Sequence, residues 1–439
     1  MADASVWEIA PTGPLRGDVR VGGAKNAVTK LLVASLLADA PSTILNAPSL
    51  GDVDITASML RSLGAGVCVE PVPGDAGSTI TVDPVTVSDG RIPVSYSGRN
   101  RVPILLVGPL LHRLGEAFVP LVGGDRIGTR PLDFHIDALR RFGAEVELTP
   151  VGLEAKASRL EGTHIRLSFP SVGATESVLL TAARAEGRTT LENAAIEPEV
   201  VELALFLQRM GARIEMQPDR VFVIEGVQSL GGAHQRLGGD RIEAMSYLVA
   251  GLATGGRVRV RGCSQDRLVT AISTLQRMGA NFEIFDDGIA AEAERLRPAA
   301  VQTSTHPGFM TDWQPPLVVL FTQVPGMSVV HETVFEDRLG YVEALRAMGA
   351  EVELFEQCLV GQACRFQQSG WQHSALVRGV TALQGADMVM PDVRGAFAYV
   401  IAAAAGQGRS TLRGVHHLER GYDRPLEKFS ELGLSITPS

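Results

Sequence analysis

Apolar positions along the chain change from a helical period to an alternating one at six places. At each place an amphipathic run with apolar residues every three or four positions ends at a glycine, and alternating apolar residues follow. This pattern predicts a helix, a glycine cap in the left-handed conformation and then a strand. The six predicted caps are Gly64, Gly143, Gly211, Gly279, Gly349 and Gly433.

The spacing of these caps indicates a large repeating unit. Gly143 and Gly211 are 68 residues apart (211 − 143), and Gly349 and Gly433 are 84 apart (433 − 349). Solenoid repeats are shorter, at about 20–50 residues. A β-rich run and a polar loop precede each helix, and further helical runs end at Gly187 and Gly255. The chain therefore reads as six mixed α/β units of about 70 residues.

Six units can close as one ring or divide into two groups of three. The chain has 439 residues, and single hydrophobic cores stop growing near roughly 250–300 residues. Two globular halves are therefore favoured. We expect the chain to cross between them near Gly23 and near Gly238.

Charge and composition exclude several classes of protein. Forty Lys and Arg residues stand against 49 Asp and Glu residues, a net charge of −9, so no overall field attracts nucleic acid. Apolar runs beginning at Pro103 and Tyr399 are too short to span a bilayer and predict buried segments. No signal-peptide pattern opens the chain, so a cytoplasmic protein without a membrane span is expected.

The four cysteines, Cys68, Cys263, Cys358 and Cys364, are too few for a secreted disulfide framework and favour a reducing compartment. Only Cys358 and Cys364 are close in sequence, and no further ligands stand near them at a zinc-like spacing. No metal site is expected from this pattern.

Several polar motifs carry candidate chemistry, each beside a plainer interpretation. GGAKNA places Lys25 and Asn26 at a helix start that suits an anion, although a glycine turn with a capping Asn is the commoner meaning. The motif GGDRIGTRPLDFH predicts a glycine-rich loop. This loop either closes over a ligand or is an ordinary exposed turn. Its Arg130 precedes a proline and is expected to be extended.

The remaining motifs, each taken alone, also fit either a functional or an ordinary structural interpretation. SVGAT, from Ser171, offers amide groups to a phosphate or is an ordinary N-cap, and Asp312 most often would cap the helix that follows it. Arg338, Arg394 and Arg420 stand in polar loops or at helix starts, where exposed arginines are common.

Together these motifs resemble a known family. GGAKNA, GGDRIGTRPLDFH, SVGAT, TDWQ, ETVFEDR, PDVRG and ERGYD occur in the order found in the enolpyruvyl transferases, in particular those acting on UDP-N-acetylglucosamine. The resemblance runs from about Gly13 to Leu434. It implies an inside-out α/β barrel of two domains, each with three βαβαββ units: residues 25–238, carrying the catalytic loop, and residues 1–24 plus 239–439. The active site is expected in the cleft between the domains.

The activity implied by the resemblance is transfer of the enolpyruvyl group of phosphoenolpyruvate to the 3-hydroxyl of UDP-N-acetylglucosamine, with release of phosphate. This is the first committed step of peptidoglycan synthesis. The reaction needs no cofactor and no metal, because proton transfer and electrostatic stabilisation are sufficient. Planar arginine forks suit a substrate that carries a carboxylate and a phosphate. No protein partner is indicated.

The resemblance also assigns roles to residues. The catalytic set is Asp125, Asp312, Lys25, Arg130 and Arg394, with Asp312 removing the proton of the sugar hydroxyl. The phosphoenolpyruvate-binding set is Lys25, Asn26, Arg130, Arg394 and Arg420. The UDP-sugar-binding set is Asn26, Arg101, Pro131, Asp133, Phe134, His135, Ser171, Val172, Gly173, Asp312, Val334 and Phe335.

Two positions depart from the family pattern. Asp125 stands where most members carry the cysteine that fosfomycin alkylates, so insensitivity to fosfomycin is expected. Phe169 and Pro170 stand where some members place a lysine near the nucleotide phosphates. An acceptor such as UMP, or a non-catalytic UDP-sugar-binding paralogue, therefore stays open as an alternative.

Overall fold

The computed structural model describes residues 6–72, 77–125 and 127–439, which fall into two compact units. Unit 1 comprises Met1–Gly22, Asp125–Arg130 and Gly239–Ser439, and unit 2 comprises Gly23–Gly124 and Pro131–Gly238. Residues 125–130 were expected in the domain of residues 25–238. Their contacts group them with unit 1 instead, because the loop is bound to Glu336 of that unit.

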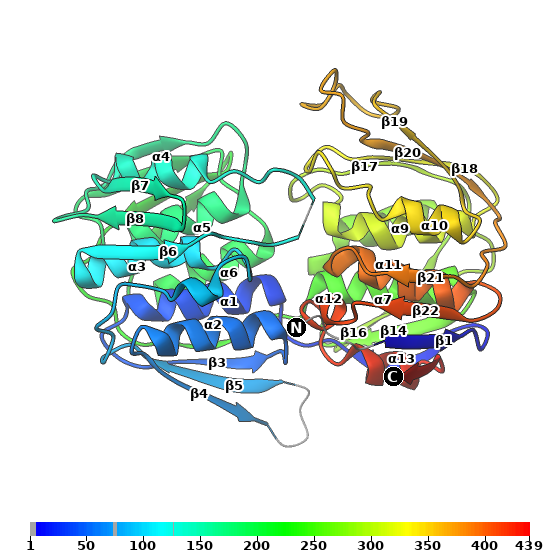
Figure 1. Cartoon of the computed structure of the whole chain (residues 1–439), viewed down its shortest axis with the longest axis horizontal. Helices are drawn as coiled ribbons and strands as arrows, with labels where there is room; N and C mark the ends of the chain where they lie inside the picture. Colours follow the sequence, from blue (N-terminus) through cyan, green and yellow to red (C-terminus); the bar gives the residue numbers. More distant parts are fainter. Residues whose placement is uncertain (1–5, 73–76, 126) are drawn as a thin grey trace. The chain divides into compact units, whose positions relative to one another are not determined.

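Unit 2 contains three sheets, with strand orders β13-β3-β5-β4, β6-β8-β7 and β11-β12-β10-β9 (Figure 1). Its strands are β3 (Ser42–Ala47), β4 (Gly66–Pro71), β5 (Ser78–Asp83), β6 (Glu116–Pro120), β7 (Glu145–Thr149), β8 (Gly152–Lys156), β9 (His164–Arg166), β10 (Arg188–Glu192), β11 (Arg213–Gln217), β12 (Val221–Glu225) and β13 (His234–Arg236). Its helices are α1 (Lys25–Ala34), α2 (Gly51–Ser62), α3 (Pro103–Leu114), α4 (Asp133–Arg141), α5 (Val172–Ala182) and α6 (Pro198–Arg209).

Unit 1 also contains three sheets, with orders β15-β16-β14-β2, β17-β18-β20-β19 and β21-β22-β1-β23. Its strands are β1 (Val6–Ala10), β2 (Arg16–Arg20), β14 (Arg257–Arg261), β15 (Asn281–Phe285), β16 (Gly288–Glu292), β17 (Ala300–Gln302), β18 (Gly326–His331), β19 (Glu351–Phe355), β20 (Ser374–Gly379), β21 (Asp387–Val389), β22 (Ser410–Arg413) and β23 (Ser435–Pro438). Its helices are α7 (Arg241–Ala253), α8 (Val269–Arg277), α9 (Gln314–Thr322), α10 (Val342–Ala347), α11 (Val393–Ala405), α12 (His416–Glu419) and α13 (Pro425–Glu431).

The backbone contains the six helix–glycine–strand repeats that the sequence pattern predicts. All six cap glycines have φ between 90° and 108°, which an L side chain rarely adopts. Each cap ends an amphipathic helix and leads into a strand, as from α8 through Gly279 into β15. In the described part of the chain, each of the five four-stranded sheets has one parallel strand pair and two antiparallel pairs, as in β2–β14 (parallel), β14–β16 and β15–β16 (both antiparallel). These pairings produce the βαβαββ unit.

The core of each unit consists of helices enclosed by sheets, which confirms the inside-out α/β prediction. Every residue of α7 and α9 is buried, and so is nearly all of α11. A helix that is apolar on all sides must be surrounded by protein. The runs from Pro103 and Tyr399 are buried in α3 and α11, as predicted. Among the described residues, no helix is long and apolar enough to cross a membrane.

One buried carboxyl group in unit 2 makes stability depend on pH. Glu176 lies on α5, and burial raises its pKa to about 7, an effect that Lys30 opposes and that Glu199 and Glu197 reinforce. The Lys30 ammonium is 3.9 Å from the Glu176 carboxylate. The unfolded chain loses this proton near its ordinary pKa of about 4.5, whereas the folded chain keeps it until about pH 7.

The contribution of Glu176 to the free energy of unfolding is therefore largest below about pH 4.5, and it falls as the pH rises to about 7. At about 1.36 kcal/mol per pKa unit, the loss is at most about 3–4 kcal/mol. We expect Glu176→Gln to match the wild type in urea unfolding at pH 5 and to exceed it at pH 8. The exposed Glu161→Gln is the control. Parallel stability curves for wild type and Glu176→Gln between pH 5 and 8 would contradict the prediction.

Candidate active site

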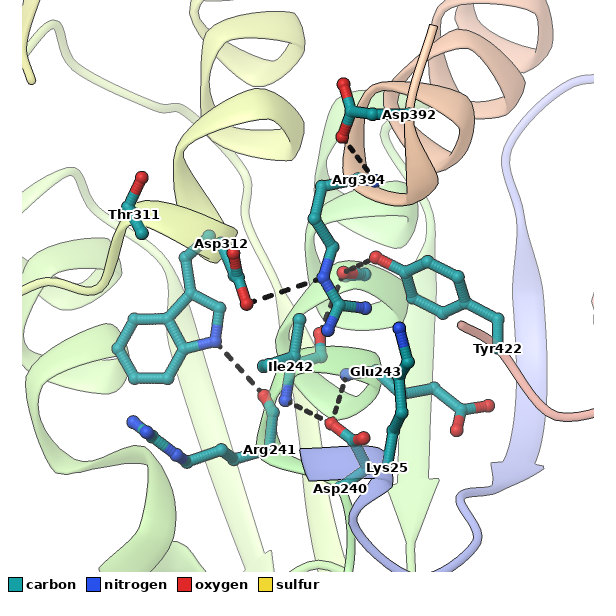
Figure 2. A network of polar contacts seen from close by, with 12 residues as sticks. Lys25, Asp240, Arg241, Ile242, Glu243, Thr311, Asp312, Asp392, Arg394 and Tyr422 are labelled. Carbon is teal, nitrogen blue, oxygen red and sulfur yellow. Dashed lines mark hydrogen bonds and ion pairs between the residues drawn. The ribbon is translucent and has the colours of Figure 1, made fainter. Parts of the chain in front are cut away.

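An acidic residue at the accessible edge of a buried arginine pair forms the centre of the site in unit 1. Asp312 lies in the turn η4 (Thr311–Trp313), directly before α9. Its carboxylate is 3.5 Å from Nε of Arg394 and 3.9 Å from Nη2 of Arg338 (Figure 2 shows the Arg394 pair). The Asp312 side chain is 19% exposed, against 5% and 1% for the two arginines. Trp313 occupies the N-cap of α9, so Asp312 does not have the capping role considered for it.

Asp392 positions both arginines from the start of α11. Its carboxylate accepts hydrogen bonds from the amides of Arg394 (2.9 Å) and Gly395 (3.2 Å), and it accepts one from Arg338 Nη1 at 3.1 Å. Burial acts to raise the pKa of Asp392, but Arg338 and the two amides lower it below its usual value. The cap thus stays ionised and holds Arg394 in the first turn of the helix.

Arg394 keeps its charge although it is buried. Burial acts to lower its pKa, but Tyr422, Asp312 and Asp240 together raise it above the ordinary value. The guanidinium carbon lies 5.2 Å from the centre of the Tyr422 ring. Arg394 Nη1 and Arg338 Nε are buried and have no hydrogen-bond partner among the described residues. The sequence pattern predicted that Arg338 and Arg394 are exposed. This prediction is wrong, because both side chains are buried.

The glycine-rich loop places Arg130 and Asp125 in the same unit. Arg130 has φ 43°, so the expectation of an extended residue before proline is wrong. Glu336 accounts for this bend: its carboxylate accepts bonds from Thr129 N (2.7 Å) and Thr129 Oγ1 (2.8 Å). Gly128 has φ 146°, which L side chains rarely adopt, and a Cβ there would lie 2.5 Å from the same carboxylate, so both features favour glycine. Arg126 lies outside the described residues.

Charges around this loop connect several of the predicted residues. Burial lowers the pKa of Arg130, while Asp125 and Asp312 raise it. The Arg130 guanidinium also stacks 5.5 Å from the Phe335 ring centre. Burial lowers the pKa of His417. The charge of Arg420 lowers this pKa further, whereas the charge of Asp125 acts to raise it. Asp125, Arg130, Asp312 and Phe335 are thus brought together.

Glu332 fixes the loop that contains Val334 and Phe335. Its buried carboxylate accepts hydrogen bonds from the amides of Val334 (2.7 Å) and Phe335 (3.1 Å), and from Thr311 Oγ1 at 2.9 Å. Burial raises the pKa of Glu332, and these amides oppose the rise. The same carboxylate therefore positions the candidate sugar-binding loop and the residue next to Asp312.

The other predicted residues lie in unit 2. Lys25 and Asn26 begin α1, and Ala24 rather than Asn26 occupies its N-cap. The Lys25 ammonium is 3.0 Å from the carboxylate of Asp52, in the first turn of α2, and both side chains are mostly buried. Lys25 is therefore a directed charge and not a solvated one.

A second cluster in unit 2 surrounds His135. Asp133, Phe134 and His135 lie in the first turn of α4, and Pro131 lies just before this helix. Burial and the charge of Arg101 lower the pKa of His135 to about 3, so its ring is neutral near pH 7. A Cβ on Gly173 would lie 3.3 Å from this ring. Ser171 caps α5 through the amide of Ala174 at 3.4 Å, with Val172 as the first helical residue. The N-cap interpretation of Ser171 is confirmed.

Sequence reasoning missed the residues that position the site. The following residues contact candidate residues but were not selected: Asp52, Glu332, Glu336, Asp392 and Tyr422. Only Asp392 has a local signal, an acidic residue one or two positions before an apolar helical run, which is typical of an N-cap.

The comparisons with known proteins agree with this fold and site. Residues 9–429 match the EPSP synthase (3-phosphoshikimate 1-carboxyvinyltransferase) family. The solved structure of the enolpyruvyl transferase NikO from Streptomyces tendae has a TM-score of 0.86 at 27% identity, covering 99% of both chains. EPSP synthase from Acinetobacter baumannii, with a TM-score of 0.73 at 17% identity, shares the fold. The chain belongs to this family of enolpyruvyl transferases.

Curated relatives within the family carry one particular name. A UDP-N-acetylglucosamine 1-carboxyvinyltransferase from Chlamydia pneumoniae is 43% identical over 98% of this chain and 94% of its own length. A protein of the same name from Nitratidesulfovibrio vulgaris is 41% identical over 97% of both chains. The predicted family and enzyme class are therefore confirmed.

Proposed function

We propose that the protein transfers the enolpyruvyl group of phosphoenolpyruvate to the 3-hydroxyl of UDP-N-acetylglucosamine and thereby begins peptidoglycan synthesis in the cytoplasm. The observation that carries the proposal is the accessible Asp312 carboxylate between the buried, charged Arg394 and Arg338. A carboxylate there can accept a hydroxyl proton, and the arginine forks can hold the anionic groups of phosphoenolpyruvate. The names of the relatives supply the acceptor.

The chemistry follows from these charges. The acceptor oxygen attacks the central carbon of phosphoenolpyruvate as its proton passes to Asp312, and the methylene carbon gains a proton from Asp125. The tetrahedral intermediate then returns a methyl proton to the Asp125 carboxylate and expels phosphate, which re-forms the carbon–carbon double bond as an enol ether of the acceptor. Lys25, Arg130, Arg394 and Arg420 bind the carboxylate and phosphate, and His135, Arg101 and Ser171 belong to the nucleotide-sugar set.

The direct test measures phosphate release from phosphoenolpyruvate by the purified protein with UDP-N-acetylglucosamine, with UMP and without acceptor. We expect release only with the UDP-sugar. Release only with UMP would assign another acceptor. Binding of the UDP-sugar without any release would indicate a non-catalytic paralogue.

Asp125 leads to a prediction about fosfomycin. The epoxide of this inhibitor needs a strong nucleophile, and a carboxylate is far weaker than a thiolate. We expect wild-type activity to survive prolonged incubation with fosfomycin, and Asp125→Cys to lose activity with time. Asp137→Cys, with the new thiol at an exposed position of α4, is the matched control and should stay active. Time-dependent inactivation of the wild type would contradict the prediction.

A further inference from the structure

Two cysteines and two histidines meet in unit 1 at a place that the proposed reaction does not use. Cys358 and Cys364 lie in the loop between β19 and β20, His373 directly precedes β20, and His331 ends β18. Their ligand atoms all lie within 4.8 Å of one another. Both histidines are fully buried. The expectation that the two cysteines lack nearby ligands is therefore wrong, because β18 and β20 pair and bring the histidines to them.

The distances fit the edges of a tetrahedron around one metal ion. Cys358 Sγ is 3.7 Å from Cys364 Sγ and 3.4 Å from His373 Nε2. With Zn–S near 2.3 Å and Zn–N near 2.0–2.1 Å, tetrahedral geometry requires about 3.8 Å between two sulfurs and about 3.5 Å between sulfur and nitrogen. The two separations measured from Cys358 match these values, and the other ligand atoms lie within 4.8 Å of one another.

The outer hydrogen bonds select the ring nitrogen that binds a metal. His331 Nδ1 is 2.6 Å from the carbonyl of Val360, and His373 Nδ1 is 2.8 Å from that of Trp371. Each Nδ1 must donate to its carbonyl, so each Nε2 carries a lone pair. His331 Nε2 is buried and has no hydrogen-bond partner among the described residues. The amide of Phe366 donates to Cys364 Sγ at 3.4 Å, a contact that favours a thiolate.

From this geometry we infer that His331, Cys358, Cys364 and His373 form a structural zinc site. Two thiolates and two neutral imidazoles fill all four positions, so the ion has no open position for catalysis. Binding Zn²⁺ releases the two thiol protons and forms two Zn–S and two Zn–N bonds, and the two thiolate charges balance the charge of the ion.

The site would order a loop that supports the candidate sugar-binding residues. Glu332 donates its amide to the carbonyl of His373 at 2.7 Å, and the Arg365 guanidinium donates to the carbonyl of Val334. Figure 1 shows the loop between β19 and β20 in orange. A zinc ion held by His373 and Cys364 would therefore support the loop of Val334 through these two hydrogen bonds.

The test is the metal content of the full-length protein, purified under reducing conditions without chelator and dialysed against trace zinc. We expect about one zinc per chain, and at least a tenfold loss in Cys358→Ser and in Cys364→Ser. Cys68→Ser, which removes an exposed cysteine of unit 2, is the matched control and should keep the metal. Wild-type protein with no bound zinc, or with iron in its place, would overturn the inference.

A second measurement does not depend on the folding of the variants. Cobalt(II) added to metal-free wild type should give the intense visible bands of a tetrahedral ion and thiolate-to-metal charge transfer, and zinc should displace them. The rival outcome is a disulfide between Cys358 and Cys364. A loss of two titratable thiols in metal-free protein exposed to air, with oxygen as the oxidant, together with a weak octahedral cobalt spectrum, would replace the metal site by that bond.

Discussion

Asp312→Asn should reduce turnover by about 10²–10⁴-fold, the range for loss of a general base. The amide has the same shape, but it cannot accept the hydroxyl proton. Arg338 keeps its 3.1 Å bond to Asp392, so the arginine pair should stay in place. Because the Asn side-chain oxygen can still accept a hydrogen bond from the sugar hydroxyl, the binding of UDP-N-acetylglucosamine, measured by calorimetry, should change little.

The comparison variant for Asp312 is Asp387→Asn. Asp387 pairs with Arg413 at 2.9 Å on the surface of unit 1, with both side chains more than half exposed. Its loss should leave phosphate release unchanged. If Asp312→Asn keeps more than about a tenth of wild-type turnover, another group removes the proton.

Arg394→Lys should lower kcat/KM for phosphoenolpyruvate by about 10²–10³-fold, the usual effect of removing one preorganised donor to developing charge. Lysine keeps the positive charge but lacks the planar fork that binds a carboxylate or phosphate with two parallel bonds. Its ammonium also cannot reproduce the contact of the guanidinium with the Tyr422 ring. The KM for the UDP-sugar should stay near the wild-type value.

Initial rates with each substrate varied in turn separate these effects. The control is Arg413→Lys, in the exposed ion pair with Asp387. It measures any loss of activity that follows from an arginine-to-lysine substitution outside the site. An equal loss of affinity for both substrates in Arg394→Lys would mean that the change disturbs the fold around Asp392. In that case Arg394 would be a positioning residue for α11.

Much of the fold follows from local sequence pattern. The six helix–glycine–strand transitions are short-range features, and glycine is strongly favoured at a helix end with φ near 100°, as at Gly279. Helices that are apolar on all sides, such as the one beginning at Val393, must be enclosed. These constraints act between near neighbours, so the sequence pattern was sufficient to predict six mixed α/β units and buried apolar segments. The inside-out arrangement was predicted only by the resemblance to a family.

The site was less accessible to the same reasoning. From local spacing, Arg338 and Arg394 had the pattern of exposed arginines, and Asp312 that of a helix cap. Only the resemblance of the ordered motifs to a family selected Arg394 and Asp312, and Arg338 was not selected at all. Its role depends on Asp392, 54 residues further along the chain.

The cluster of two cysteines and two histidines shows most clearly what local sequence pattern cannot predict. Cys358 and Cys364 are neighbours in sequence, but their partner His331 comes from β18, and antiparallel pairing with β20 sets it beside His373. Secondary structure and repeat boundaries were determined by residues close in the chain, through backbone sterics and apolar periodicity. The Arg338–Asp392 pair, the Glu336 contact that bends the loop before Pro131, and the Cys₂His₂ cluster were decided by tertiary structure, because strand pairing and helix packing bring together charges and ligands that no local pattern connects.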